Sequence, residues 1–238
     1  MIGLGTAINI GLIIAGSLCG LAFDRFMKEN LKQTLMMVSG IIVLLLGMSG
    51  AMQYMLVIVN GTLQTTGPML MIISMVAGAI IGELIDLNRW ITVFGDWVKA
   101  KTGNTGDPQF THAFITASLT FTVGAMGVLG SIQDGLTGNY QTLLLKGILD
   151  GIIVMVMVSS MGKGALFSFI PVGITQWIIT AMAHIAAPLM TPSAIDNLSY
   201  VGSILIFCVG IDLIWPGKIR IANLLPAIFV AMGLTFLL

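Results

Sequence analysis

Two charged residues inside one long apolar segment are the strongest candidates for chemistry in this sequence. Lys146 and Asp150 stand four residues apart in LLLKGILDGIIVMVMVSSMG, so on a helix they share a face and can form an ion pair. A charge within a membrane is costly unless it is paired, and it usually serves a function. Asp150 is therefore a candidate ligand for a cation or proton, with Lys146 as a competing internal cation. A structural ion pair, or a lysine that reaches the membrane surface, is the alternative.

The apolar segment before this pair is rich in hydroxyl groups. Thr116 and Thr120 lie one helical turn apart, and Asp134 follows near the end of the segment. These groups could line a polar path beside Asp150. Serine and threonine side chains can instead bond to carbonyls of their own helix, which is the structural alternative.

A second pair of acids occurs in GAIIGELIDL, where Glu83 and Asp86 are three residues apart near the end of an apolar segment. Two carboxylates on one face can bind a hard cation such as Na⁺ with help from carbonyl groups. They can equally meet Arg89 at the membrane surface. Glu83 lies about one turn deeper and is the better ligand candidate.

Three amide side chains interrupt other apolar segments, namely Asn9, Gln176 and Asn223. Within a membrane such groups commonly form hydrogen bonds between helices. Asn223 is also followed by Pro226, which can free a backbone carbonyl to face an ion. We therefore add all three amides to the candidate ion- or substrate-binding residues.

The composition is that of a membrane protein. Hydrophobic residues make up 57% of the 238 residues and charged residues only 8%, with a mean hydropathy of +1.03, whereas soluble domains carry about a quarter charged residues. The formal net charge is zero, which gives no argument for a nucleic-acid partner. No nucleophile elbow, phosphate-binding glycine loop, HExxH or CxxC motif occurs. We expect no enzyme activity, no catalytic residue, no cofactor and no metal centre.

The pattern of apolar segments predicts an all-α helical bundle, formed as a single membrane domain over residues 1–238. A helix of about 20 residues crosses the hydrocarbon layer. The eight predicted spans cover residues 2–23, 34–58, 68–87, 110–132, 143–162, 165–189, 199–215 and 219–238.

The basic residues favour one orientation for these eight spans. Every Lys and Arg except Lys146 falls on one side of the membrane, in alternate connections or, for Arg220, at the start of the last span. By the positive-inside rule that side is cytoplasmic, which places both termini outside. Residues 88–101 carry Trp90 and Trp97 opposite charged residues, a pattern that predicts an interfacial amphipathic helix.

The sequence also contains a candidate internal repeat. Residues 29–48 align without gaps on residues 192–211, with matching small residues such as Gly47 and Gly210. In the predicted topology this repeat is inverted and relates spans one to three to spans six to eight. Inverted repeats are typical of secondary transporters, which bind their substrate near the midplane. Chance alignment of similar apolar segments is the alternative.

Several separate segments resemble one family over essentially the whole chain. They are GTAINIGLIIAGSLCG, GAIIGELIDL, FTVGAMGVLGSIQDGL, KGILDGI and KIRIANLLPA. The sequence is similar to the YqgA/YdfK-type bacterial polytopic membrane proteins, a family of unknown function for which a sodium channel or pump has been suggested. The resemblance implies a multi-pass protein of the bacterial cytoplasmic membrane, and it carries over no residue roles.

Two functions from different classes remain. The first is a secondary transporter or channel for a small cation, Na⁺ or H⁺, with Asp150, Glu83 and the hydroxyls along the path. The second is a non-transporting scaffold or accessory subunit whose polar residues join helices. A small organic solute is a further candidate cargo. The expected partners are the lipid bilayer, a monovalent cation and a second copy in a homodimer.

Overall fold

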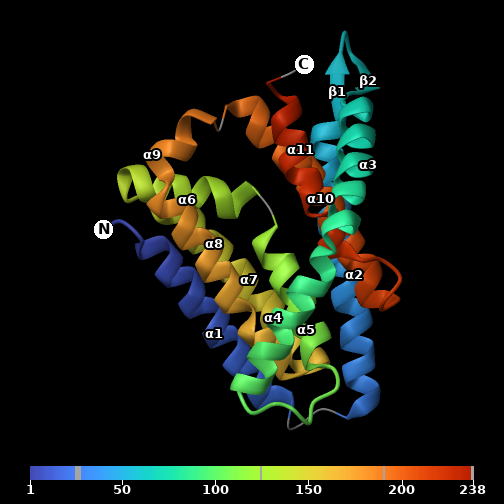
Figure 1. Ribbon diagram of the computed structural model, residues 1–238, viewed down its shortest axis with the longest axis vertical. Coiled ribbons are helices and arrows are strands. Elements are labelled where there is room, and N and C mark those ends of the chain that lie inside the picture. The colour runs from blue at the N-terminus through green and yellow to red at the C-terminus, as the bar shows by residue number, and fades with distance from the viewer. Residues whose placement is uncertain (25–27, 124, 190, 237–238) are drawn as a thin grey trace.

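The computed structural model describes residues 1–24, 28–123, 125–189 and 191–236, and nearly all of them are helical (Figure 1). Three short 3₁₀ helices cover Lys163–Ser168, Ala187–Leu189 and Ile221–Leu224. A hairpin of two strands joins α2 to α3, with β1 at Leu56–Val59 and β2 at Thr62–Thr65. The α-helices are α1 (Leu4–Asp24), α2 (Glu29–Met55), α3 (Pro68–Ile85), α4 (Leu87–Lys101), α5 (Phe110–Thr122), α6 (Ala125–Thr137), α7 (Gln141–Met161), α8 (Phe169–Ala181), α9 (Ala183–Ala186), α10 (Pro192–Ile214) and α11 (Pro226–Leu234).

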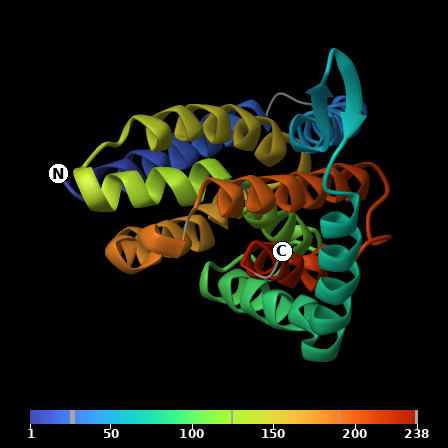
Figure 2. The ribbon, with the colours of Figure 1, turned by 90° about the horizontal axis from the view of Figure 1, so that it is seen from above.

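The helices form two groups that lie beside each other (Figure 1). One group contains α1, α6, α7 and α8, and the other contains α2, α3, α10 and α11. Viewed from above, α10 runs between α2 on one side and α11 on the other (Figure 2). Helix α5 packs against members of both groups, so it occupies the centre of the molecule.

Glycines allow the closest helix contacts in both groups. A Cβ atom on Gly16 of α1 would lie only 2.1 Å from the carbonyl oxygen of Gly151 in α7. In the second group, a Cβ on Gly47 of α2 would lie 2.2 Å from the backbone nitrogen of Phe207 in α10. Small residues at these positions let the backbones approach, which is how membrane helices associate without a hydrophobic driving force between them.

Six of the described helical segments are long and apolar enough to cross a membrane. The predicted all-helical architecture with several spans is therefore present. The predicted number of eight spans is not confirmed. The six are residues 4–23, 30–55, 68–85, 141–161, 163–181 and 192–214. Helices α5 and α6 make a seventh only if they count as one span bent by 60°.

The predicted last span, 219–238, is shorter in the structure. The apolar helical segment runs only from Ile221 to Leu234, and residues 237–238 lie outside the described part of the chain. It starts as a 3₁₀ helix and becomes α-helical at Pro226. Proline is well tolerated at the first turn of a helix but not within one, so it marks a new helix start here.

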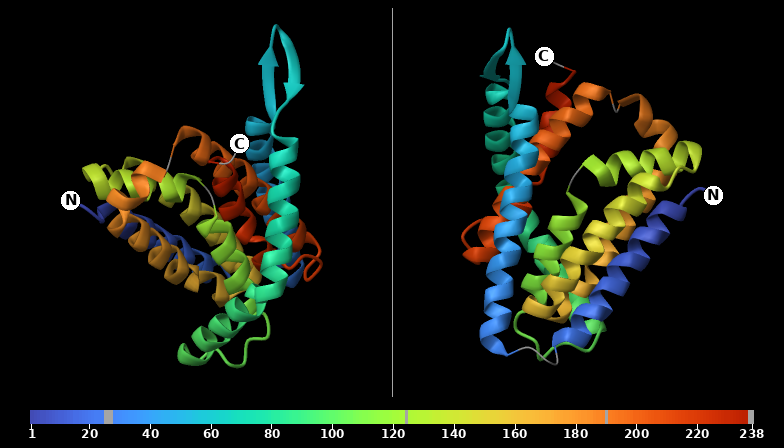
Figure 3. Two further views of the ribbon diagram at one scale, coloured as in Figure 1. Left: turned by 45° about the horizontal axis from the view of Figure 1, so that its top comes forward. Right: turned by 180° about the vertical axis from the view of Figure 1, so that it is seen from behind.

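The predicted second span, 34–58, is wrong at both ends. Helix α2 begins earlier, at Glu29, and ends at Met55 because residues 56–59 form a strand. Val57, Ile58 and Val59 favour strand conformation, and Asn60–Gly61 adopts positive φ at both positions, 51° and 76°, as a tight hairpin turn requires. The hairpin projects beyond the helices (Figure 3).

The two ends of the molecule differ in what they carry. The hairpin and the last described turn of α11 lie toward one end, which we call the hairpin end, and the start of α1 lies about halfway along the long axis (Figure 1). The start of α2, the α4–α5 connection and the connection that carries Lys163 lie at the opposite end, which we call the basic end. Arg25, one of the basic residues used for the topology, lies outside the described residues.

The predicted amphipathic helix at 88–101 is present as α4 at the basic end. Trp90 and Trp97 are exposed, whereas Val98 is buried, and Lys99 and Lys101 occupy the last turn. The indole rings therefore face outward, as residues that anchor a helix at a membrane surface do.

Candidate functional site

The expected ion pair between Lys146 and Asp150 is present on α7. The Lys146 Nζ atom contacts the Asp150 Oδ2 atom, and less than a tenth of either side chain is exposed. Asp150 stands nine residues from the start of α7 and eleven from its end, which at about 1.5 Å per residue places it near the middle of a membrane-spanning helix. A lysine reaching the membrane surface does not fit this burial.

Two of the predicted amides surround the pair. Asn9 of α1 lies near the Asp150 carboxylate and against Gly147 of α7. Gln176 of α8 and the Lys146 side chain both come within 4 Å of the position that a Cβ on Gly127 would take. Both amides are buried, and among the described residues none of their side-chain polar atoms has a hydrogen-bond partner. Buried polar groups are normally paired, so these amides have hydrogen-bonding capacity left for water or a ligand.

A cavity of about 260 Å³ lies beside the ion pair, and we call it the central cavity. Lys146, Asp150 and Thr120 contribute to its wall from one side. Gln53 of α2 and Ser203 of α10 contribute from the other helix group. The ion pair therefore faces a space shared by both helix groups.

Sequence reasoning missed the contributions of α2 and α10 to this cavity. Ser199 and Ser203 are four residues apart, so they share one helix face, and that spacing was an available signal. Gln53 is an amide inside the predicted span 34–58, so it carried the same signal as Asn9 and Gln176. Only the packing of α2 against α10 brings it to the cavity.

The break between α5 and α6 also opens onto the central cavity. Helix α5 ends at Thr122 and α6 starts at Ala125, and Val123, Met126 and Gly127 around the break line the cavity. The end of a helix carries unpaired carbonyl groups and a partial negative charge. A broken helix near the midplane is therefore able to stabilise a cation.

The hydroxyl groups of α5 divide between two places. The Thr120 hydroxyl lines the central cavity but donates to the Thr116 carbonyl at 2.8 Å. Ser118 likewise donates to the Phe114 carbonyl. Both hydroxyls thus donate to carbonyls of their own helix, as the structural alternative predicts. The Thr120 oxygen can still accept a hydrogen bond or ligate an ion.

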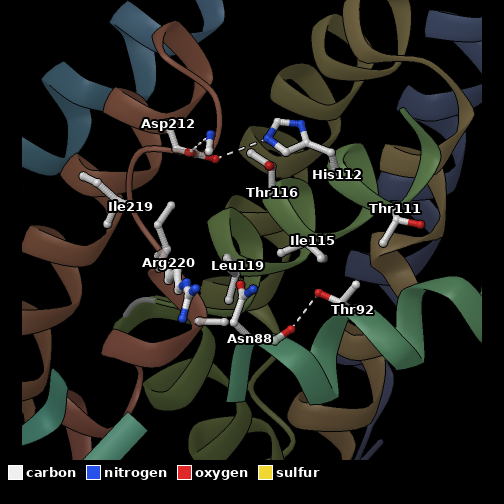
Figure 4. A pocket seen from close by; sticks show the side chains of 13 residues that line it. Asn88, Thr92, Thr111, His112, Ile115, Thr116, Leu119, Asp212, Ile219 and Arg220 are labelled. Carbon is white, nitrogen blue, oxygen red and sulfur yellow. Dashed lines mark hydrogen bonds and ion pairs between the residues drawn. The ribbon is translucent and has the colours of Figure 1, made fainter. Parts of the chain in front are cut away.

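Thr116 lines a separate cavity of about 370 Å³, which we call the basic-end cavity (Figure 4). His112 and Asp212 meet across it, with 3.3 Å between Nε2 and Oδ2. The other Asp212 oxygen accepts a bond from the Gly217 backbone at 2.8 Å. This pair thus ties α5 to the end of α10.

Glu83 lies apart from the central cavity. Its carboxylate pairs with Arg220 at 3.2 Å, and about half of the Glu83 side chain is exposed. Arg220, rather than Arg89, is the partner because the segment after α10 folds back along the end of α3. The structure does not bring Glu83 together with Asp150.

Asn223 and Asp134 hold helix ends. The Asn223 side-chain oxygen accepts a bond from the Asn88 backbone at 2.6 Å, near the start of α4. The Asp134 carboxylate accepts one from the Gly5 backbone at 3.1 Å, near the start of α1. A polar or negative group at a helix N-terminus satisfies free N–H groups there, which gives both residues a structural role.

A model of the family described as "Protein of unknown function (DUF554)" matches residues 4–236. The chain belongs to this family. The uncharacterized membrane protein YdfK of Bacillus subtilis (strain 168) is 27% identical over 235 residues, which cover 98% of this chain and 96% of YdfK. The uncharacterized protein YqgA of Escherichia coli (strain K12) is 24% identical over 240 residues, 98% of this chain and 96% of YqgA. No solved structure matches the chain significantly.

The family and the helices agree on the setting of the site. The chain is a membrane protein in contact with lipid, as the description of YdfK and the apolar helices both indicate. Large apolar side chains on α2 and α3, such as Leu46, Ile72 and Val76, are exposed, as is usual for helix faces that meet hydrocarbon. The Lys146–Asp150 pair is thus a buried pair within a membrane domain.

Proposed function

We propose that this protein moves a small monovalent cation, Na⁺ or H⁺, across the bacterial cytoplasmic membrane as a secondary transporter or channel. One observation carries the proposal: a buried Lys146–Asp150 pair halfway along α7, facing a cavity that both helix groups line. Ionisable residues at such a position mark ion pathways more often than they stabilise a fold.

The pair supplies a simple exchange chemistry. The Asp150 carboxylate can hold one cation, and in this structure that cation is the Lys146 ammonium. A Na⁺ ion that enters the central cavity competes for the same oxygens. Ion binding therefore requires that the carboxylate exchange the ammonium for the ion.

Further ligands for a hard cation are close by. Na⁺ prefers oxygen ligands, and oxygen from carboxylates, amides, hydroxyls and backbone carbonyls all serve. Asn9 contributes an unpaired amide oxygen and Thr120 a hydroxyl oxygen. The broken end of α5 adds carbonyl groups beside the cavity. These groups would replace part of the ion's hydration shell.

The contacts between α2 and α10 support the proposed inverted repeat. The alignment of 29–48 on 192–211 pairs residues that differ by 163, so Gly47 corresponds to Gly210 and Leu44 to Phe207. Gly47 faces Phe207, and Gly210 faces Leu44. The alignment therefore maps this contact onto itself, as a two-fold axis through the helix crossing requires. Such an axis in the membrane plane is typical of transporters.

The orientation is part of the same proposal. The basic end faces the cytoplasm, and the hairpin and both termini face outward. The scaffold alternative assigns the ion pair a purely structural role. A central cavity of about 260 Å³ also approaches the size of small-molecule pockets, which keeps a small organic solute as an alternative cargo.

Flux into liposomes that contain the purified protein tests the proposal, with Na⁺, K⁺ and H⁺ measured separately. We expect flux of one ion, and a decrease of about tenfold or more in Asp150→Asn, because the variant removes the charge that holds the ion. Glu83→Gln is the matched control, since it neutralises an acid in an exposed ion pair. Its flux should stay within about twofold of the original protein.

Two results would contradict the proposal. Absence of flux for all three ions, from protein that is folded, favours the scaffold or the organic solute. Flux that survives in Asp150→Asn but falls in Glu83→Gln moves the pathway to the end of α3.

A further inference from the structure

A third cavity lies next to the central cavity at the hairpin end. It has a volume of about 370 Å³, and we call it the outer cavity. It lies between α2, α3 and α10, at the base of the hairpin. Gln53 and Tyr54 of α2 line both the outer cavity and the central cavity. These two adjacent residues are therefore the wall that separates the two spaces.

The outer cavity has the chemistry of an entrance for a cation. Asp196 lines it and is exposed, and among the described residues it forms no ion pair. Asn197 lines it as well, donating its amide N–H to Thr235 at 2.8 Å. A free carboxylate at the mouth of a narrow space raises the local concentration of cations.

The basic-end cavity does not adjoin the ion pair directly. It and the central cavity share no described lining residue. A small cavity of about 130 Å³, lined mainly by apolar side chains, shares Leu119 with the basic-end cavity and Val123 with the central cavity. Thr116 belongs to the basic-end cavity and Thr120 to the central cavity, so about one turn of α5 separates them. The central cavity, which Asp150 lines, thus adjoins a polar space toward the hairpin end, whereas the small cavity toward the basic end is mainly apolar.

We propose that Gln53 and Tyr54 form the outer gate through which the ion passes between the outer cavity and Asp150. This inference rests on the proposed cation transport and identifies its route. Gln53 is exposed and Tyr54 is half-buried, so neither side chain is locked into a packed core. The Gln53 amide oxygen can take part in the ion's shell as it passes, and Tyr54 contributes an aromatic side chain to both cavities. Both stand directly before the hairpin, whose strand β1 begins at Leu56.

Thiol labelling tests the gate without any need for ion flux. The background replaces both natural cysteines, Cys19 and Cys208, by alanine. Ser203→Cys then places one thiol in the central cavity. We expect a membrane-impermeant thiol reagent added outside intact cells to modify it, because a cysteine reacts only where the reagent has access. Adding Gln53→Trp should slow the reaction by about tenfold or more.

Two further thiols serve as controls. Ser193→Cys lies in the outer cavity, beyond the gate, so its labelling should not change with Gln53→Trp. Ser17→Cys lies fully buried on α1 and should not react from either side. If Gln53→Trp does not fold, Tyr54→Ala tests the same wall in the opposite direction and should make Ser203→Cys react faster.

The gate is overturned if Ser203→Cys reacts only from the side of the membrane opposite to the one from which Ser193→Cys reacts, or if neither gate variant changes its rate. Its failure is distinguishable from failure of the proposed function. Flux that depends on Asp150, with labelling insensitive to Gln53 and Tyr54, rejects the gate alone. Labelling as expected, with no flux of Na⁺, K⁺ or H⁺, rejects cation transport and leaves a water-filled path.

Discussion

At the scale of single residues, the Lys146–Asp150 pair is distinguished by neighbouring side chains whose polar atoms are not hydrogen-bonded. Burying two charges is expensive, and their attraction repays it only when the remaining hydrogen-bonding positions are also used. Asn9 and Gln176 stand beside the pair with unpaired side-chain atoms. If the ion pair served only to stabilise the fold, we would expect these amide atoms to form hydrogen bonds. We interpret this unused capacity as room for a water or an ion.

Removing one partner or both distinguishes the energetic role of the pair from its function. Lys146→Met alone leaves an uncompensated buried carboxylate and should destabilise the protein by about 3–5 kcal/mol. Lys146→Met combined with Asp150→Asn leaves no buried charge and should recover most of this loss. Thermal unfolding in detergent measures both. The double variant should be folded but unable to move ions, whereas normal flux from it would show that the pair is structural.

The sequence was sufficient to find the pair but not the whole site. Charges within an apolar segment stand out, so Lys146 and Asp150 are visible from their type and spacing alone. Glu83 was also a candidate ligand, yet its partner Arg220 lies 137 residues away, and only tertiary packing shows that the two meet at an exposed position. Gln53 and Ser203 were missed although both are polar residues inside predicted spans, because only helix packing brings them to the same cavity as Asp150.

At the scale of helices, glycines decide which pairs can pack closely. Gly16→Ala would place a methyl group 2.1 Å from the Gly151 carbonyl oxygen, so α1 would have to move away from α7. We expect a loss of about 1–3 kcal/mol, the usual cost of overpacking. Gly11→Ala is the matched control on the same helix, because nothing lies within 4 Å of its new methyl group. Thermal unfolding measures both, and equal stability of the two variants would contradict this packing.

Helix boundaries were the least predictable part of the fold. The existence of most helices followed from long apolar segments. The hairpin was missed because Leu56–Val59 continues the apolar character of α2, although Asn60–Gly61 was a visible turn signal. Among the described residues, no proline in α5 explains the break between α5 and α6. Its position among Gly-rich sequence was visible, but the 60° bend was not.

At the scale of the whole molecule, the proposed direction of the ion path depends on which end faces the cytoplasm. Ile58→Cys in the hairpin, where 74% of the side chain is exposed, should react with an impermeant thiol reagent on intact cells. Gly106→Cys in the α4–α5 connection, with open space around it, should react only after the membrane is permeabilised. The background lacks Cys19 and Cys208. The reverse result would invert the topology and place the outer cavity at the cytoplasmic side.

The predicted homodimer stays a prediction at this scale. The central and outer cavities are lined by one copy of the chain, so a second copy is not required to complete the site. The mass of the detergent-solubilised protein, measured by light scattering with the detergent subtracted, determines the oligomeric state.

The central claim is that Asp150 is the residue that holds the ion, and equilibrium binding tests it most directly. The unfolding temperature of the purified protein would be followed as NaCl or KCl replaces choline chloride at constant ionic strength, and separately as the pH is changed. A ligand that binds only the folded state raises this temperature. We predict a shift for one ion in the original protein and in Glu83→Gln, and none in Asp150→Asn. An equal shift in Asp150→Asn would place the ion elsewhere and contradict the account.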